Sequence, residues 1–132
     1  MPTIIRRSYP GVMESRREVF VTTTWHVHSG IWTPPTDVYE TEENLVVKME
    51  VAGMREEDFE VSVEDQVLIL RGTRPDRNER RAYYQMEIRF GKFEISIGLP
   101  AGIDLDKAIA EYKDGFLTVI FPKLHAKHIE VE

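Results

Sequence analysis

The chain has 132 residues, of which 23 are acidic and 17 basic, so its formal net charge at pH 7 is −6. That length and a hydrophobic content of 42% indicate one globular domain with its own core, which argues against wholesale disorder. The sequence has no cysteine, which excludes disulfides, thiolate zinc sites and cysteine nucleophiles.

The acidic balance argues against nucleic acid as a partner, because proteins that bind its backbone depend on clustered positive charge. The sequence also lacks the roughly 20 consecutive apolar residues of a membrane span and the shorter apolar stretch of a secretory signal. We therefore expect a cytoplasmic protein without a membrane partner. We expect the arginine cluster in the middle of the chain to be a solvated loop. That cluster comprises Arg71, Arg74, Arg77, Arg80 and Arg81.

Residues 1–33 are expected to form a variable or partly disordered N-terminal arm. Four arginines against two glutamates make residues 1–31 positive, so the arm should be attracted to the acidic remainder. Its apolar residues follow no sustained period, so it cannot bury them alone, and a short helix over Met13–Phe20 stays open. We place the domain boundary at Trp32–Pro35, because its two prolines favour extended backbone there.

Beyond this boundary the chain predicts short strands separated by turn signals. Apolar and polar residues alternate from Leu45 to Val51, and the run closes at Ala52-Gly53. The segments Phe59–Glu64 and Val67–Gly72 flank the tight connection Asp65-Gln66. We expect those two segments to form a hairpin.

The remaining strand signals lie in the C-terminal third. Phe93–Ile97 alternates cleanly, and Asp114-Gly115 is a turn signal between the strand segments Ala108–Tyr112 and Phe116–Phe121. Six or more short strands without crossover helices favour an all-β fold. We predict an antiparallel, immunoglobulin-like β-sandwich over residues 34–122.

The long loop at residues 74–91 departs from this pattern. It begins as a charged segment, but its second half contains Tyr83, Tyr84, Met86 and Ile88, more apolar surface than a simple connection should expose. A strand-like patch of this kind could pair with the edge strand of another subunit. It could equally be a lid folded back on its own sheet, and patterning alone does not decide between the two.

Several segments occur in the order seen in the α-crystallin domain. The most specific is the run from Ala110 to Lys123, which resembles the family signature alanine-x-x-x-(Asn/Asp)-Gly-x-Leu. The other matching runs are Pro35–Glu40, Val47–Gly53, Val61–Gly72, Gly91–Phe93 and Leu99-Pro100. Over residues 34–132 the chain therefore resembles a small heat-shock protein of the nonmetazoan type.

Within the short tail at residues 123–132, Ile129-Glu130-Val131 resembles the family's isoleucine-x-isoleucine/valine anchor. In the family this anchor adds to a groove between two edge strands of a neighbouring domain. The matching strands here would be Phe59–Glu64 and Leu105–Tyr112. The alternation of side chains lets Ile129 and Val131 enter one apolar slot together. The residues expected to line that groove are Val61, Val63, Ile109 and Ala110.

The resemblance implies an ATP-independent holdase chaperone without a cofactor, which binds unfolding client proteins and assembles from dimers into larger homo-oligomers. It implies that the four apolar loop residues named above sit in a strand exchanged between dimer partners, where they meet the partner's Asp37–Glu40 region. In one departure from the family, Ile95 stands where an arginine is common, so that arginine's contact cannot be carried over. The arm residues expected to contact clients or to fill the oligomer interior are Phe20, Val21, Trp25 and Ile31.

Two other classes of function are disfavoured. The sequence has no phosphate-binding loop, nucleophile elbow, zinc-protease helix motif or dinucleotide-binding turn, so we do not expect an enzyme. The pairs His26/His28 and His125/His128 lack fixed carboxylate or thiolate partners, so we expect solvated imidazoles and no metal site, with a pH-sensitive tail as a minor alternative. The alternative function is that of a co-chaperone sandwich similar to p23, which is usually monomeric and acts on another chaperone.

Overall fold

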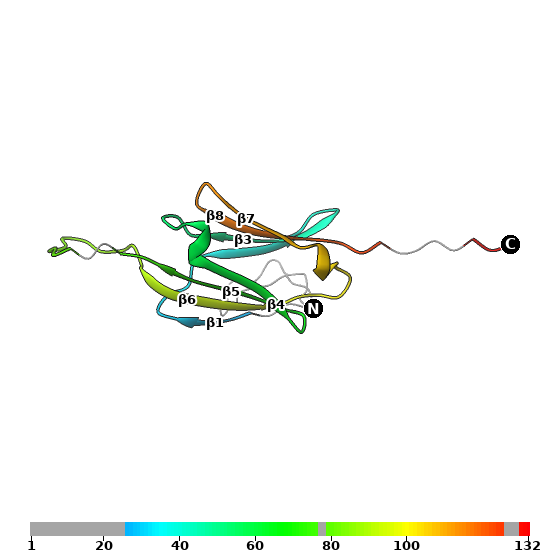
Figure 1. Cartoon of the computed structure of the whole chain (residues 1–132), viewed down its shortest axis with the longest axis horizontal. Helices are drawn as coiled ribbons and strands as arrows, with labels where there is room; N and C mark the ends of the chain where they lie inside the picture. Colours follow the sequence, from blue (N-terminus) through cyan, green and yellow to red (C-terminus); the bar gives the residue numbers. More distant parts are fainter. Residues whose placement is uncertain (1–25, 77–78, 126–129) are drawn as a thin grey trace, which may run out of the picture.

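The computed structural model describes residues 26–76, 79–125 and 130–132, and of His26–Gly30 only the backbone. In these ranges eight strands form two antiparallel sheets of four strands each. The sheets pack face to face, with β3, β7 and β8 in one layer and β1, β4, β5 and β6 in the other (Figure 1). The all-β sandwich predicted from the sequence is therefore confirmed.

One sheet has the strand order β1-β6-β5-β4. Its strands are β1 (His26–Gly30), β4 (Phe59–Glu64), β5 (Val67–Arg74) and β6 (Gly91–Gly98). The predicted hairpin is confirmed, because β4 pairs with β5 from Phe59 opposite Gly72 to Glu64 opposite Val67.

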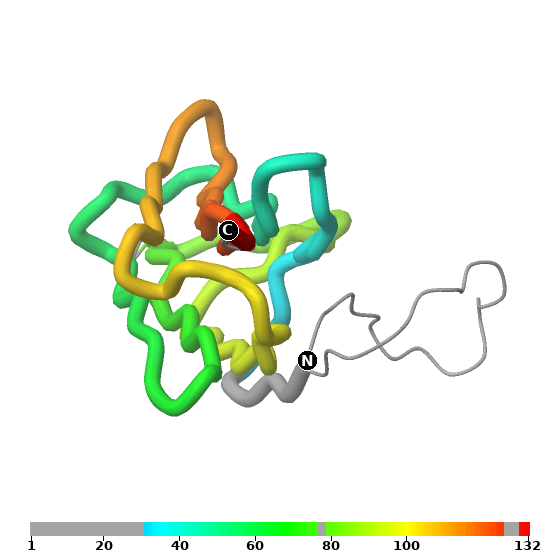
Figure 2. The backbone as a smooth tube through the Cα atoms, turned by 90° about the vertical axis from the view of Figure 1, so that its right-hand side faces the viewer, coloured from blue at the N-terminus to red at the C-terminus, as the bar shows by residue number. Residues whose placement is uncertain are grey.

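The other sheet has the order β2-β3-β8-β7. Its strands are β2 (Thr36–Glu40), β3 (Asn44–Glu50), β7 (Ile109–Lys113) and β8 (Phe116–Pro122). In the view turned by 90°, the cyan and orange strands of this sheet lie above the green and yellow strands of the other (Figure 2). Two single-turn 3-10 helices, η1 (Glu56–Asp58) and η2 (Leu105–Lys107), precede β4 and β7.

The core lies between the sheets and follows from the period of two in each strand. Alternate residues of β3, β5, β6 and β8 are buried, and Val46 of β3 and Gly98 of β6, which lie between or beside them, are buried as well. The fully buried side chains include Leu45, Val47, Met49, Leu68, Leu70, Phe93, Ile95, Ile97, Val119 and Phe121. Burial of each of them is worth about 1.5–3 kcal/mol before the cost of ordering the chain.

Two tight turns set the strand register. Asp65 and Gln66 have φ values of 52° and 66°, and Asp114 and Gly115 have 53° and 84°. Positive φ at both central residues is the geometry of a type I′ turn, whose twist matches that of the strands it joins. Gly115 also lies close to Ala52, because a Cβ added to it would come within 3.3 Å of the Ala52 Cβ.

The sandwich begins earlier in the chain than the proline boundary predicts. β1 lies inside the segment expected to be the arm, and it pairs with β6 from His26 opposite Ile97 to Gly30 opposite Phe93. This pairing uses backbone N–H and C=O groups, so it needs no apolar period in the sequence. The strand that the sequence places at Leu105–Tyr112 also differs, because Leu105–Lys107 forms η2 and β7 begins at Ile109.

The long connection runs over residues 75–90, between the end of β5 and the start of β6. It projects from one end of the sandwich, whereas the C-terminal end of the chain extends from the other (Figure 1). Across the described ranges, no helix has both the length and the apolar character needed to cross a bilayer.

Candidate functional site

Each sheet has two edge strands, and these are the first candidates for contact with another chain. The edges are β1 and β4 in one sheet and β2 and β7 in the other. An edge strand can accept a further strand through its backbone, which makes it a docking site unless something covers it. β4 and β7 correspond to the two strands that the family resemblance implies on either side of a groove.

A groove does lie between β4 and β7, with a volume of about 510 Å³. Five of its eight lining side chains are apolar or aromatic, and the other three are charged. The lining residues are Glu56, Phe59, Val61, Ala110, Glu111, Tyr112, Lys113 and Leu117. This composition suits an extended apolar segment with polar flanks.

Two of the four residues predicted to line the groove are among these. Val61 and Ala110 line it, whereas Val63 packs against the hydrophobic core and the exposed Ile109 lies outside the lining. Sequence reasoning missed Phe59 and Tyr112. Both could have been found, because each is two residues from a predicted lining residue on the same strand and therefore on the same face.

Tyr112 and Phe59 line the groove and pack against the core beneath it, and we call this pair its floor. Their ring centroids lie 4.9 Å apart at an angle of 51°. The Tyr112 hydroxyl donates a hydrogen bond to the carbonyl oxygen of Val51 at 2.8 Å, and the backbone N–H of Met54 donates to that hydroxyl at 3.4 Å. The floor is thus fixed to the segment that follows β3.

The anchor residues of the tail are only partly covered by the structure. Val131 is 96% exposed, and Ile129 lies outside the described residues. Their insertion into the groove therefore stays a prediction. Two contacts attach the first residue of the tail to the sandwich. The backbone N–H of Lys123 donates to the Glu43 carbonyl, and the Lys123 ammonium lies 2.9 Å from the Glu40 carboxylate.

The loop at residues 75–90 presents its apolar side chains to solvent. Tyr84 is fully exposed, Met86 is 62% and Ile88 64% exposed, and about half of Tyr83 is exposed. A lid folded back on its own sheet would bury these side chains, so the single chain does not have that arrangement. Their pairing with a partner's β2 stays a prediction.

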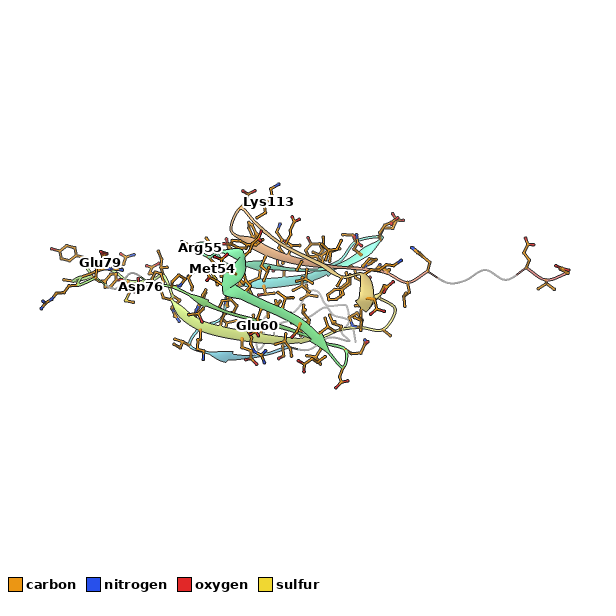
Figure 3. All side chains as sticks on the ribbon, in the orientation of Figure 1. Met54, Arg55, Glu60, Asp76, Glu79 and Lys113 are labelled. Carbon is orange, nitrogen blue, oxygen red and sulfur yellow. The ribbon has the colours of Figure 1, made fainter. Side chains whose placement is uncertain are left out.

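Acidic groups hold the tip of this loop together. The Arg81 guanidinium lies 2.8 Å from the Asp76 carboxylate and 3.1 Å from that of Glu79, and it donates to the Tyr83 hydroxyl. Both acids lie on the projecting part of the loop (Figure 3). The hydrogen bond to Asp76 raises the pKa of Arg81 above its ordinary value.

The other arginines of the predicted cluster lie in different surroundings. Arg71 pairs with Glu94 at 2.9 Å, Arg74 donates to backbone carbonyls, and Arg80 is exposed. Arg77 lies outside the described residues. Arg71 and Arg81 are each neutralised by carboxylates, which is the pattern of a solvated protein surface.

Three of the four predicted client-binding residues, Phe20, Val21 and Trp25, lie outside the described residues, and the fourth, Ile31, is exposed. The side chains of His26, His28 and His128 are likewise not described. Among the residues with described side chains, no three histidine, aspartate or glutamate groups are placed to hold a metal ion.

Comparison with known proteins identifies one family. The profile of the Hsp20/alpha crystallin family matches residues 37–132. The chain is 34% identical over 99 residues to heat shock protein 16 of Schizosaccharomyces pombe, a match that covers 72% of this chain and 69% of that protein. It is 29% identical over 92 residues to small heat shock protein C2 of Rickettsia felis, covering 68% of this chain and 60% of the relative.

Comparison with solved structures supports the same fold. A small heat-shock protein from Xylella fastidiosa superposes with a TM-score of 0.67 at 26% identity, covering 76% of this chain and 97% of that one. Heat shock protein 16.0 of S. pombe superposes with a TM-score of 0.63 at 29% identity, covering 77% and 100%. The matched segment nevertheless spans only 60% and 61% of the length of the two Rickettsia felis relatives.

Proposed function

Because this chain belongs to the Hsp20/alpha crystallin family, we propose that it is an ATP-independent holdase that works as a dynamic oligomer of dimers. Membership of the family supports a chaperone role in general. The finer statement is that the protein binds partly unfolded clients in the cytoplasm and prevents their aggregation. The comparisons give the p23-like alternative no support.

The observation that supports this proposal is a set of large apolar side chains that the sandwich does not bury in its core. The sandwich buries its own alternating residues, yet Tyr84, Met86 and Ile88 remain exposed on a projecting loop. Exposed apolar side chains gathered in one segment mark a site of interaction. Hydrophobic contact is non-directional and needs no nucleotide, which suits a protein that must bind many unfolding partners.

Dimers would form by strand exchange between two copies. The second half of the loop of one subunit carries the exposed Tyr84, Met86 and Ile88, and β2 of the other is an edge strand that includes Asp37–Glu40. Backbone pairing supplies part of the affinity, and burial of the loop's aliphatic and aromatic side chains supplies the rest. The exposed Tyr39 ring on β2 offers one apolar contact for them.

Larger assemblies would form when the tail of one subunit enters the β4/β7 groove of another. Insertion of Ile129 and Val131 is worth roughly 3–6 kcal/mol gross. Ordering a free tail consumes much of this, so one anchor should bind with a dissociation constant of about mM to μM. Several weak anchors in one particle hold it together while each one opens readily. Opening would expose the groove and the arm to clients.

Two measurements on the full chain test the proposal. Light scattering after size exclusion should give a particle of several dimers, and the protein without nucleotide should suppress the heat-induced aggregation of an unrelated enzyme. An equal mass of a non-chaperone protein controls for crowding. A particle at the monomer mass of 15.4 kDa, together with a client that precipitates at its usual rate, would reject the proposal.

A further inference from the structure

Arg74 ends β5 at the point where the long loop leaves the sandwich, and its guanidinium reaches the other end of that loop. Nε and Nη2 donate to the carbonyl oxygen of Arg89 at 2.9 and 2.6 Å. Nη1 donates to the carbonyl oxygen of Ala52, just beyond β3 in the opposite sheet, at 3.2 Å. The Arg74 side chain thus connects the two ends of the loop, at residues 74 and 89, to each other and to the opposite sheet.

Two aromatic rings complete the surroundings of this guanidinium. Its central carbon lies 4.3 Å from the centroid of the Trp32 ring and 5.6 Å from that of Phe90. Trp32 is itself fixed, because its Nε1–H donates to the carbonyl oxygen of Gly91 at 2.9 Å and its ring meets that of Phe93 edge-on at 5.6 Å. The cation therefore rests on a ring that is buried in the hydrophobic core.

The contacts of Arg74 depend on the shape of the guanidinium as well as on its charge. A planar fork can place three N–H groups on two carbonyl oxygens while its face stacks on an indole. An ammonium could keep the cation over Trp32 but could not make the paired bonds to one carbonyl. The position thus distinguishes arginine from lysine.

We propose that Arg74 is a positioning residue for subunit pairing: it fixes the direction in which the loop leaves the sandwich, so that the apolar loop residues are presented to a partner. This rests on the proposed strand exchange and adds to it the residue that preorganises the exchanging segment. A loop held in its binding direction loses less conformational freedom on pairing, and its affinity is higher for that reason.

The absence of cysteine allows the loop direction to be measured directly. Spin labels attached through Gln85→Cys on the loop and Glu60→Cys on β4 report the distance between loop and body in the full chain. Labelled subunits are diluted into excess unlabelled protein, so that only distances within one chain are seen. Pairing is measured in parallel, without labels, from the dependence of dimer dissociation on protein concentration.

The informative variants are Arg74→Met, which keeps the aliphatic stem, and Arg74→Lys, which keeps the charge. Arg89→Met is the matched control, because it removes a cation from the same loop base but keeps the backbone carbonyl that Arg74 binds. We expect Arg74→Met to broaden the distance distribution and to weaken pairing about tenfold, with Arg74→Lys intermediate. Arg89→Met should behave as the wild type, and far-UV circular dichroism should show an intact sandwich in all three.

Other outcomes overturn the proposal in distinguishable ways. If Arg74→Met pairs like the wild type, or if Arg74→Met and Arg89→Met weaken pairing equally, Arg74 has no positioning role. Should Arg74→Met fail to fold, the lysine variant decides. An Arg74→Lys protein with the wild-type distance distribution and the wild-type dimer dissociation constant would reject the requirement for the planar guanidinium. If the wild type does not pair at all, strand exchange itself is wrong, and the role assigned to Arg74 in pairing falls with it.

Discussion

The ring centroids of Phe59 and Tyr112 lie 4.9 Å apart, and this contact joins edge strand β4 of one sheet to edge strand β7 of the other. The two strands belong to different sheets, so side chains make the connection across the floor of the groove. A floor that is already packed does not have to be ordered when a tail binds, which favours even a weak anchor.

The Tyr112 hydroxyl should contribute to stability through its two hydrogen bonds, to the Val51 carbonyl and from the Met54 N–H. Tyr112→Phe keeps the ring contact and removes both bonds, so we expect the free energy of unfolding to fall by about 0.5–1.5 kcal/mol. Denaturant titration at a fixed protein concentration measures it, because assembly adds stability that depends on concentration. Tyr39→Phe, which removes an exposed hydroxyl from β2, is the control, and an equal effect of both changes would contradict the prediction.

The tail prediction concerns assembly alone. Changing Ile129 and Val131 together to alanine removes most of the apolar surface that the groove would bury, which is worth roughly 3–6 kcal/mol gross for each anchor. Light scattering across a dilution series should then show dimers in place of larger particles. Glu130→Ala is the control, since the alternation rule turns this residue away from the slot. A particle mass that does not respond to the double change means that the tail is not the anchor.

The groove can also be tested by a substitution in its lining, with the tail sequence unchanged. Ala110 is the smallest side chain in the lining, and Ala110→Leu would fill the space that an incoming isoleucine or valine needs. We expect the same loss of large particles in light scattering, with the sandwich intact because the position is exposed. Ile109→Leu, at the exposed neighbour outside the lining, should leave particle mass unchanged. Large particles that persist in Ala110→Leu would place the tail elsewhere.

The loop prediction concerns the dimer. In an extended segment Tyr84 and Met86 lie on one face and Gln85 on the other. The double change of Tyr84 and Met86 to serine should therefore weaken dimer formation by at least about tenfold, which is 1.4 kcal/mol and well below the burial energy of two large side chains. Sedimentation over a range of concentrations measures the dissociation constant. Gln85→Ser should change it little, and equal effects would indicate that only the backbone pairs.

The sequence predicted those parts of the fold that leave a side-chain pattern. The β4–β5 hairpin follows from alternation around Asp65-Gln66, and the register in the structure is the one that this pattern requires. β1 was missed because an edge strand can be held by its backbone, which leaves no apolar period to read. Of the groove, Val61 and Ala110 were predicted, whereas the floor ring of Tyr112 was not.

The projection of the loop could not be read from the sequence for a different reason. Its apolar residues are consistent with burial against its own sheet or against a partner, and periodicity does not distinguish these. The direction is set by contacts far apart in the chain, above all those of Arg74 with Trp32 and the Ala52 carbonyl. Long-range contacts of single polar side chains have no local signature.

Ile95 provides the sharpest test of the core, because the resemblance to the small heat-shock proteins implies an arginine at the position it occupies. Here the side chain is 1% exposed, and on β6 it stands opposite Leu70 of β5. Ile95→Arg would bury a cation among apolar groups, so we expect unfolding to become easier by about 3 kcal/mol or more. Ile95→Val, which removes one methylene, should cost only about 0.5–1.5 kcal/mol. Thermal and denaturant unfolding of both variants measure the difference. An Ile95→Arg protein as stable as the valine variant would mean that the arginine finds an acidic partner or solvent at this site, and that the core does not exclude the family's residue.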